Sequence, residues 1–572
     1  MRRAAHWALA AMLPVLAACG GGGGSSNDPL MRQTSAGPIV GASDSASATY
    51  AWKGVPYAKP PVGALRWSAP VDVDSWTATK TTTAFGNACV QYGRIYGPGA
   101  NNKYDATIGT TLNTPVGSED CLYLNVWRPA TAEGNLPIIV FFHGGSNVSG
   151  YTADPMYDGA SLAKNANAIV VTPNFRLGIF GFLNLPQVNG TASGNYTMLD
   201  SIKALQFVRA NALVFGGNPE NVTIVGQSAG AINVWALQTS PAMVAANPKL
   251  FHRVMPMSGG ISLATNLPAG SIPTLSPAAQ YLAQGNSLLQ NFVIADGFAT
   301  DAASAQAYIA TKTNAQIADY MRSKTSAQVI TTLLTKLALV GLAGSGPIPD
   351  GTVVASDAIA AINAGNYVKV PVLASNARDE GKLFPSFLPL VGGAPPSARL
   401  VTDAQLFANH FSYNPNAAPA TTVDQWIAAS YLPVNTPVTG FTARAELLNS
   451  VFFLRSRDNV LNALKAKQDN VWYYRFDWDK QPAPWNDIYG AVHVIDLPFL
   501  FGNFGPSLFG NVWFNDANKA GRLELSSAMQ QSISSFARSG DPNNAALGTT
   551  WAPWPSRLVF DASLTAKAIH SE

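Results

Sequence analysis

The chain has 572 residues, of which 47% are hydrophobic and 12% are charged. It is long enough to bury a large core, and its length alone permits about two to four domains. The net charge is +3 and falls to +1 without Arg2 and Arg3, which gives no electrostatic reason to expect a nucleic acid or a strongly acidic partner.

The N-terminal segment predicts export. Residues 1–18 combine two arginines with a following apolar run, which is the order of charge and apolar residues in a secretory signal peptide. Residues 16–19, Leu-Ala-Ala-Cys, resemble the bacterial lipobox, in which the cysteine is lipidated and becomes the mature N-terminus. Gly20, and no aspartate, follows Cys19, and this resembles lipoproteins of the Gram-negative outer membrane. A plain cleaved signal peptide is the alternative.

We expect the rest of the chain to form one domain. Residues 19–30 are rich in Gly and Ser, a composition typical of a flexible tether. Over 31–572, Pro and Gly are scattered, no repeat of fixed period occurs, and no apolar stretch reaches the roughly 18 residues of a membrane-spanning helix. The sequence therefore predicts a single domain over 31–572 that meets a membrane only through the N-terminal lipid.

Cys89 and Cys121 are the two cysteines outside the N-terminal segment. An exported protein meets an oxidising compartment, in which an even pair of cysteines tends to bond. We predict a disulfide between them, which closes a loop of about 30 residues and stabilises the fold by about 3 to 4 kcal/mol through the unfolded chain. Two free, buried thiols are the alternative.

Short apolar runs alternate with amphipathic stretches, which is the signature of a mostly parallel sheet covered by helices. Residues 136–142 predict a fully buried strand that ends in the glycine-rich loop 143–146, and 168–172 is the next strand. Apolar residues recur with helical spacing over 200–215. Later strands are predicted at 222–225, 370–374 and 471–476. The predicted fold class is α/β.

The pentapeptide 226–230, Gly-Gln-Ser-Ala-Gly, directly follows the strand 222–225. This G-x-S-x-G pattern is typical of a serine nucleophile on a strand-to-helix turn. Glycines are needed on both sides because a side chain two residues before or after the serine collides across the sharp turn. An ordinary glycine-flanked turn is the alternative, but the strand before the pattern favours Ser228 as a nucleophile.

Further motifs occur in a consistent order along the chain. They are residues 52–58 (Trp-Lys-Gly-Val-Pro-Tyr-Ala), 60–63, 65–67, 118–126 (Ser-Glu-Asp-Cys-Leu-Tyr-Leu-Asn-Val), 174–178, 215–219, 251–253, 258–259 and 536–543. Together with 226–230 they resemble the type B carboxylesterases, and the resemblance extends from about residue 30 to the C-terminus. It implies an α/β-hydrolase fold, with a central, mostly parallel sheet flanked by helices and with helical cap insertions, and it implies hydrolysis of carboxylic esters.

Acyl transfer by a serine needs a base that takes the serine proton and an acid that orients the base. In this fold the acid and then the histidine follow the serine along the chain. His493 fits because it follows the strand 471–476 and its surroundings resemble the family's histidine loop. The other histidines fit less well: His6 is in the signal, His143 precedes the serine, His252 precedes any candidate acid, His410 follows no strand and His570 is in the terminal tail.

Glu380 is the predicted acid because it follows the strand 370–374 and matches the family's glutamate. Asp379 is the alternative, since a small shift in the turn would bring its carboxylate to the imidazole. Asp200 and Asp350 are interpreted as structural helix and turn residues.

The oxyanion hole is expected to use three backbone N–H groups. Ala229 supplies one because it follows the nucleophile, and the resemblance assigns the other two to Gly145 and Ser146. Ser146 departs from the family, in which a third glycine is commoner, and its side chain narrows the space for bulky acyl groups. Gly144 is expected to serve the geometry of the loop.

The substrate is less constrained by the sequence. Cholinesterases hold a quaternary ammonium on a tryptophan of the disulfide loop, but 89–121 contains tyrosines and no tryptophan, so no choline preference is expected. The Ala-rich segment 262–345 and residues 384–390 are expected to form a helical cap around an apolar gorge, although buried packing alone explains 384–390 equally well. We expect aryl or short-to-medium alkyl esters, and a cell-surface position suits bulky or polymeric ones.

Two alternative functions remain open. The same triad hydrolyses amides or carbamates, because fold and triad do not set the leaving group. Some relatives use this fold as a non-catalytic adhesion module, but such members typically lose the nucleophile, which this chain retains. The sequence contains no H-E-x-x-H, C-x-x-C or phosphate-loop motif, so neither a metal nor another cofactor is expected.

Overall fold

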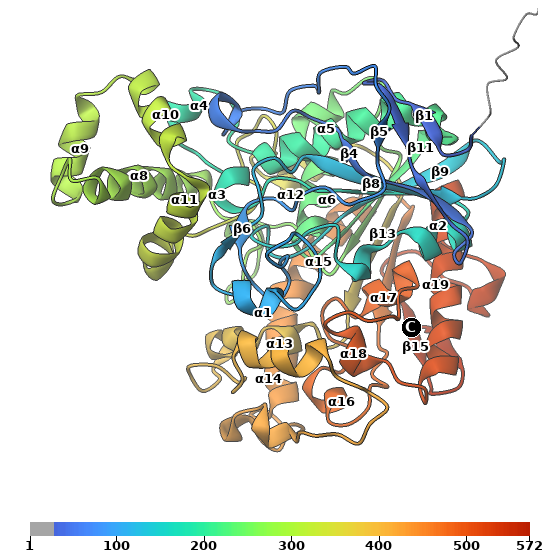
Figure 1. Ribbon diagram of the computed structural model, residues 1–572. Helices are drawn as coiled ribbons and strands as arrows, with labels where there is room; N and C mark the ends of the chain where they lie inside the picture. Colours follow the sequence, from blue (N-terminus) through green and yellow to red (C-terminus); the bar gives the residue numbers. More distant parts are fainter. Residues whose placement is uncertain (1–27) are drawn as a thin grey trace, which may run out of the picture.

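The computed structural model describes residues 28–572, and Figure 1 shows their arrangement. The predicted signal peptide, Cys19 and most of the predicted tether lie outside the described residues. Among the helices of residues 28–572, none combines the length and the apolar character that a membrane span needs.

A large sheet organises the described part of the chain (Figure 1). It has 11 strands in the order β16-β15-β14-β13-β12-β11-β9-β10-β8-β4-β3. Neighbouring strands are parallel from β15 to β10, and the pairs at both ends of the sheet are antiparallel. The strands are β3 (Ala42–Asp44), β4 (Thr49–Pro56), β8 (Tyr123–Pro129), β9 (Leu136–Phe142), β10 (Ile169–Pro173), β11 (Gly217–Gln227), β12 (Arg253–Met257), β13 (Val372–Ala377), β14 (Val471–Phe476), β15 (Leu558–Ala562) and β16 (Lys567–Ser571).

The predicted strands are all present in this sheet. The burial of β9 shows why their sequences are continuous apolar runs. Every residue of β9 is buried. Val140 and Phe142 enter one hydrophobic core, whereas Ile139 and Phe141 enter a second core. Because side chains alternate between the two faces of a strand, the two cores lie on opposite faces of the sheet. A parallel sheet covered on both faces has this composition.

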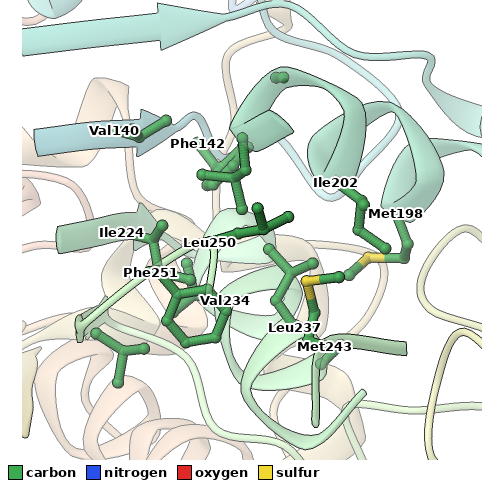
Figure 2. Close-up of a cluster of buried hydrophobic side chains, with 14 of the residues drawn as sticks. Val140, Phe142, Met198, Ile202, Ile224, Val234, Leu237, Met243, Leu250 and Phe251 are labelled. Atoms are coloured by element: carbon green, nitrogen blue, oxygen red, sulfur yellow. The ribbon is translucent and has the colours of Figure 1, made fainter. Parts of the chain in front are cut away.

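Helices cover both faces. α5 (Tyr196–Asn211), α6 (Ala229–Thr239), α12 (Ala358–Ala364) and α15 (Arg455–Lys465) form one layer, and α2 (Ala160–Ala166), α17 (Asp496–Phe501) and α19 (Lys519–Ser539) form the other. Figure 2 shows part of the first core, which contains Val140 and Ile224 of the sheet, Met198 of α5 and Val234 of α6. The predicted helix at 200–215 is confirmed as α5, which begins four residues earlier, and a short 3₁₀ turn, η3 (Leu213–Phe215), follows it.

The Ala-rich segment 262–345 is helical, as predicted. Its helices α8 (Ala278–Ala295), α9 (Ala302–Ala310), α10 (Asn314–Ser323) and α11 (Ser326–Thr332) extend to one side of the sheet (Figure 1). Three of these helices, α9, α10 and α11, begin with a capping box, in which Asp301, Thr313 and Thr325 are the N-cap residues. We call 262–345 the helical arm. It has its own core, which joins the body at Trp67, Ile179 and Phe180.

The remaining elements are short or peripheral. They are β1 (Met31–Gln33), β2 (Pro38–Val40), β5 (Lys80–Thr81), β6 (Gln91–Tyr92), β7 (Pro115–Val116), α1 (Ile108–Thr111), α3 (Gly178–Gly181), α4 (Pro186–Asn189), α7 (Pro241–Val244), α13 (Asp403–Phe411), α14 (Phe441–Leu448), α16 (Trp485–Ile488) and α18 (Gly510–Trp513). Two 3₁₀ segments, η7 (Glu380–Leu383) and η8 (Pro385–Val391), follow β13.

Candidate active site

Ser228 lies on a sharp turn between β11 and α6. Its backbone has φ 58° and ψ −124°, a conformation that non-glycine residues rarely adopt and that a surrounding structure must enforce. The Ser228 N–H donates a hydrogen bond of 2.9 Å to the Met257 carbonyl of the neighbouring strand. From Val222 to Ala231, Ser228 is the one residue that is partly exposed. The strained turn therefore brings this hydroxyl out of a buried strand and helix.

The glycines around Ser228 are required by backbone contacts. A Cβ on Gly226 would lie 2.2 Å from the Gly230 carbonyl oxygen, and a Cβ on Gly230 would lie 2.1 Å from the Phe142 carbonyl oxygen. Such distances are far inside van der Waals contact. The G-x-S-x-G pattern thus reflects the crossing of β11, α6 and the end of β9 at one point.

Glu380 and His493 come together although 113 residues separate them. Glu380 begins η7 after β13, and its Oε2 bonds to His493 Nδ1. Glu380 Oε1 accepts the Ala377 N–H at 2.8 Å and the Asn376 side-chain amide at 3.2 Å. Glu380 is fully buried and His493 is 2% exposed. The carboxylate is therefore oriented at both oxygens, as the partner of a general base must be.

Asp379, the alternative acid, faces a different part of the histidine loop. Its Oδ2 accepts the Ala491 N–H at 2.9 Å and one Arg378 N–H at 2.8 Å. The Asp379 N–H donates in return to the Ala491 carbonyl at 2.8 Å. Asp379 thus joins the acid turn to the backbone two residues before His493, and it does not contact the imidazole through a hydrogen bond.

A second buried carboxyl lies near this pair. Asp496 opens α17, is fully buried, and accepts a hydrogen bond of 3.2 Å from the Tyr474 hydroxyl. Burial, and then the charge of Glu380, raise the pKa of Asp496 to about 7. Its titration near neutral pH was not visible in the sequence.

The glycine loop after β9 lies against Ser228. A Cβ on Gly144 would lie 2.9 Å from Ser228 Cβ. Gly145 and Ser146 have φ 101° and 56°, and the Asn147 and Asn233 side chains hydrogen-bond reciprocally and tie the loop to α6. Within the described residues, the N–H groups of Gly145, Ser146 and Ala229 donate to no other protein atom. Such free donors are what an oxyanion needs.

Three other histidines have identifiable structural roles. His143 is stacked on Phe175 and burial lowers its pKa to about 4. His410 bonds to the Tyr489 hydroxyl at 2.8 Å, and burial lowers its pKa to about 3. His252, which directly precedes β12, lies near Glu220. The two aspartates interpreted as structural also have local partners: Asp200 pairs with Arg176, and Asp350 accepts three backbone N–H groups.

An aromatic cluster covers the imidazole. The rings of Phe384 and Phe453 lie 5.1 and 5.2 Å from the His493 ring, measured between centroids. Phe384 also contacts Phe387, which is 40% exposed. An apolar wall therefore runs from the candidate base toward the surface through residues 384–390. The helical arm reaches the other side of the site, where the Ser345 hydroxyl donates to the Asn147 carbonyl.

The structure contains the predicted disulfide between Cys89 and Cys121. The loop that it closes carries β6, α1 and β7. Tyr96 and Tyr104 of this loop pack on Phe509 and Phe411. These two tyrosines therefore contribute to the core of the C-terminal region.

One contact at the site was not predicted. The side-chain amide of Gln227, the residue before the nucleophile, lies 3.1 Å from His493 Nε2. The second position of G-x-S-x-G, which Gln227 occupies, is free in the pattern, so no signal in the sequence marked this residue. No group of three or more His, Cys, Asp or Glu within 28–572 is placed to hold a metal ion.

Comparison with known proteins identifies relatives over nearly the whole chain. The profile of the family described as "Carboxylesterase family" matches residues 28–567. The para-nitrobenzyl esterase of Bacillus subtilis is 30% identical over 93% of this chain and 95% of its own length. The fumonisin B1 esterase of Sphingopyxis macrogoltabida is 29% identical over 92% of this chain and 85% of its own length.

Solved structures give the same result. A para-nitrobenzyl esterase structure superimposes with a TM-score of 0.69 at 26% identity and covers 95% of this chain and 97% of its own. A carboxylesterase of Geobacillus stearothermophilus has a TM-score of 0.68 at 26% identity and covers 95% and 98%. The mostly parallel sheet with helices on both faces is thus the α/β-hydrolase fold, as predicted.

Proposed function

Because the chain belongs to the carboxylesterase family and is a carboxylic ester hydrolase, we propose that it acts through an acyl-enzyme formed on Ser228. The hydrogen-bonded pair of Glu380 and His493 beside the strained serine carries this proposal. Proton transfer requires a base whose tautomer is fixed, and a carboxylate on Nδ1 fixes it.

The proposed cycle has two halves. Ser228 Oγ attacks the ester carbonyl while His493 Nε2 takes the hydroxyl proton, and the imidazolium then protonates the leaving alcohol. Water attacks the acyl-enzyme by the same route, and the proton returns to Ser228 as the carboxylic acid leaves. The negative oxygen of each tetrahedral intermediate accepts hydrogen bonds from the N–H groups of Gly145, Ser146 and Ala229, which have no acceptor among residues 28–572. One such donor is typically worth about 2.7 to 4 kcal/mol of barrier.

We propose aryl or short-to-medium alkyl esters as substrates. The wall of Phe384, Phe387 and Phe453 supplies apolar surface next to the base, and the exposed Ser146 side chain limits the width beside the oxyanion. The names of the two relatives, a para-nitrobenzyl esterase and a fumonisin B1 esterase, support esters with bulky groups. The absence of tryptophan from 89–121 argues against a choline preference.

The test is hydrolysis of p-nitrophenyl esters from acetate to palmitate, with wild type and Ser228→Ala side by side. Turnover that disappears in a folded Ser228→Ala protein is expected, and the chain-length optimum measures the acyl pocket. Retained turnover in Ser228→Ala would contradict the proposal. A matched p-nitroanilide series distinguishes amide hydrolysis, and absence of turnover on both series would favour a binding role.

We also propose export and lipidation at Cys19, with attachment to the outer membrane of a Gram-negative cell. The charge and apolar order of residues 1–18 and the Leu-Ala-Ala-Cys sequence support it. Incorporation of radiolabelled palmitate into wild type and not into Cys19→Ser is the expected result. Equal labelling of both proteins would exclude this site. If the natural substrate is a bulky or insoluble ester, the lipid-tethered protein should hydrolyse it faster than protein that lacks the tether.

A further inference from the structure

Gln227 lies between the glycine loop and the candidate base. Its side chain is almost completely buried, at 1% exposure. Its Nε2 is 3.1 Å from His493 Nε2, and a Cβ added to Gly144 would lie 2.8 Å from its Oε1. The amide therefore fills the space next to Gly144 and reaches the imidazole nitrogen that faces away from Glu380.

The direction of this hydrogen bond follows from the other ring nitrogen. Nδ1 of His493 faces the Glu380 carboxylate, which can only accept, so Nδ1 carries the proton in the neutral ring. Nε2 then has a lone pair, and the Gln227 amide donates to it. The Ser228 hydroxyl is not a hydrogen-bond partner of Nε2 among the described contacts. The lone pair that must take the serine proton is thus occupied by an amide of the neighbouring residue.

Building on the proposed function, we infer that Gln227 is a positioning residue for the base. It holds the neutral imidazole of His493 with Nε2 toward the elbow, and the Ser228 hydroxyl replaces it at Nε2 when acylation begins. A neutral amide suits this task because it stabilises the neutral ring, which is the form that accepts a proton. A carboxylate at the same place would instead stabilise the imidazolium and remove the base at low pH.

A substitution at Gln227 leaves the other charged and titratable groups near the imidazole unchanged. Those on the acid turn and the adjoining elements are Glu380, Asp379, Arg378, Lys382, Asp496, Tyr473 and Tyr474. Phe384 and Phe453 cover the ring and carry no charge. A change in the pH profile caused by a substitution at Gln227 therefore reports the group at Nε2.

The experiment measures kcat/KM for p-nitrophenyl butyrate across about pH 5 to 10 for wild type, Gln227→Glu and Gln227→Met. Gln238→Met is the matched control, since Gln238 is a buried amide of α6 that bonds to the Val368 carbonyl, away from the triad. The rate of inactivation by a fluorophosphonate, measured over the same range, reports the serine and the base without an ester substrate.

For Gln227→Glu we expect the acid limb of both profiles to move up by about one pH unit or more, the usual effect of an opposite charge at hydrogen-bond distance. Activity then falls about tenfold at low pH and recovers at high pH. Gln227→Met should lose kcat across the range, with a smaller shift of the limb, and Gln238→Met should keep the wild-type limb. An unchanged acid limb in folded Gln227→Glu, or equal shifts in the Gln238 control, would overturn the inference. The turnover of wild type against Ser228→Ala tests the proposed function separately.

Discussion

The two halves of the site are built in different ways. The nucleophile half, Ser228 with its glycines and the loop after β9, is fixed by backbone contacts within a few residues of 226–230 and 143–147. The acid–base half joins Glu380 and His493, which are 113 residues apart, through side-chain hydrogen bonds between two loops. A side chain at Gly226 or Gly230 collides with neighbouring backbone, whereas the hydrogen bonds of the acid–base half can be altered one at a time. The nucleophile half therefore determines whether the Ser228 hydroxyl is exposed to substrate. The acid–base half determines how strongly His493 accepts the serine proton, and single substitutions can change it.

The largest effect is expected when the acid–base half is broken at Glu380. In Glu380→Gln the amide oxygen stays on the Ala377 N–H and the Asn376 amide, because an amide NH₂ there would face two donors. The NH₂ group then points at His493 Nδ1 and forces the ring proton onto Nε2, which can no longer accept from Ser228. We expect kcat to fall by about 10³ to 10⁴-fold, measured on a p-nitrophenyl ester.

Its control is Glu220→Gln, a change at an exposed carboxylate that pairs with Arg209 on the surface. This variant should keep the wild-type kcat. A folded Glu380→Gln protein within threefold of wild type would show that the carboxylate does not select the tautomer.

The nucleophile half is broken by Gly230→Ala. The new Cβ would lie 2.1 Å from the Phe142 carbonyl oxygen and 2.8 Å from the His143 carbonyl oxygen, and both neighbours are backbone, so α6 or the glycine loop must move. A displacement of about 1 Å at reacting groups costs about 10²-fold in rate. We expect at least this loss in kcat/KM, with less folded protein. Gly134→Ala, where a Cβ meets nothing within 4 Å, should match wild type in both yield and rate.

A third substitution weakens the attachment of the histidine loop to the acid turn and leaves the hydrogen bonds of the imidazole intact. Asp379→Asn weakens the charge-assisted bond to the Ala491 N–H. A loss of about 1.4 kcal/mol in positioning lowers kcat by about tenfold. Asp479→Asn is the matched control because Asp479 also binds Arg378 at 2.8 Å, but it does not contact the histidine loop. Equal effects of the two substitutions would assign the role to Arg378 instead.

The same contrast explains what the sequence could predict. The elbow was found from five residues because the serine and both glycines lie within one short pattern, although the backbone contact that requires Gly230 comes from Phe142 of β9. Residues 379 and 380 could be ranked only through the family resemblance, since they are adjacent and both are carboxylates. The turn after β13 sends Glu380 to the imidazole and Asp379 to the backbone of the histidine loop, and this choice depends on tertiary packing. The contact of Gln227 with His493 joins residues 266 positions apart and leaves no mark in either local sequence.

The smallest effect on rate, and a measurable one on stability, is expected from Asp496→Asn. Burial raises the pKa of Asp496 from the ordinary aspartate value of about 3.9 to about 7 in the folded protein. The folded state therefore keeps the proton that the unfolded state releases, and stability is lost as pH rises from about 4 to about 7. This penalty is on the order of a few kcal/mol above pH 7, and Asn at 496 removes it while still accepting the Tyr474 hydroxyl.

We expect the melting temperature of Asp496→Asn, relative to wild type, to increase between pH 5 and pH 8, with kcat little changed. The nucleophile half has the opposite dependence, because burial lowers the pKa of His143 to about 4 and stability falls as pH drops from about 6.5 to about 4. In wild type these slopes oppose each other, and His410, whose pKa burial lowers to about 3, has the same sign of slope as His143. The substitution should therefore expose the combined slope of His143 and His410 as a steeper loss of stability on acidification. A melting-temperature difference that stays constant from pH 5 to pH 8 would show that Asp496 does not change protonation on unfolding.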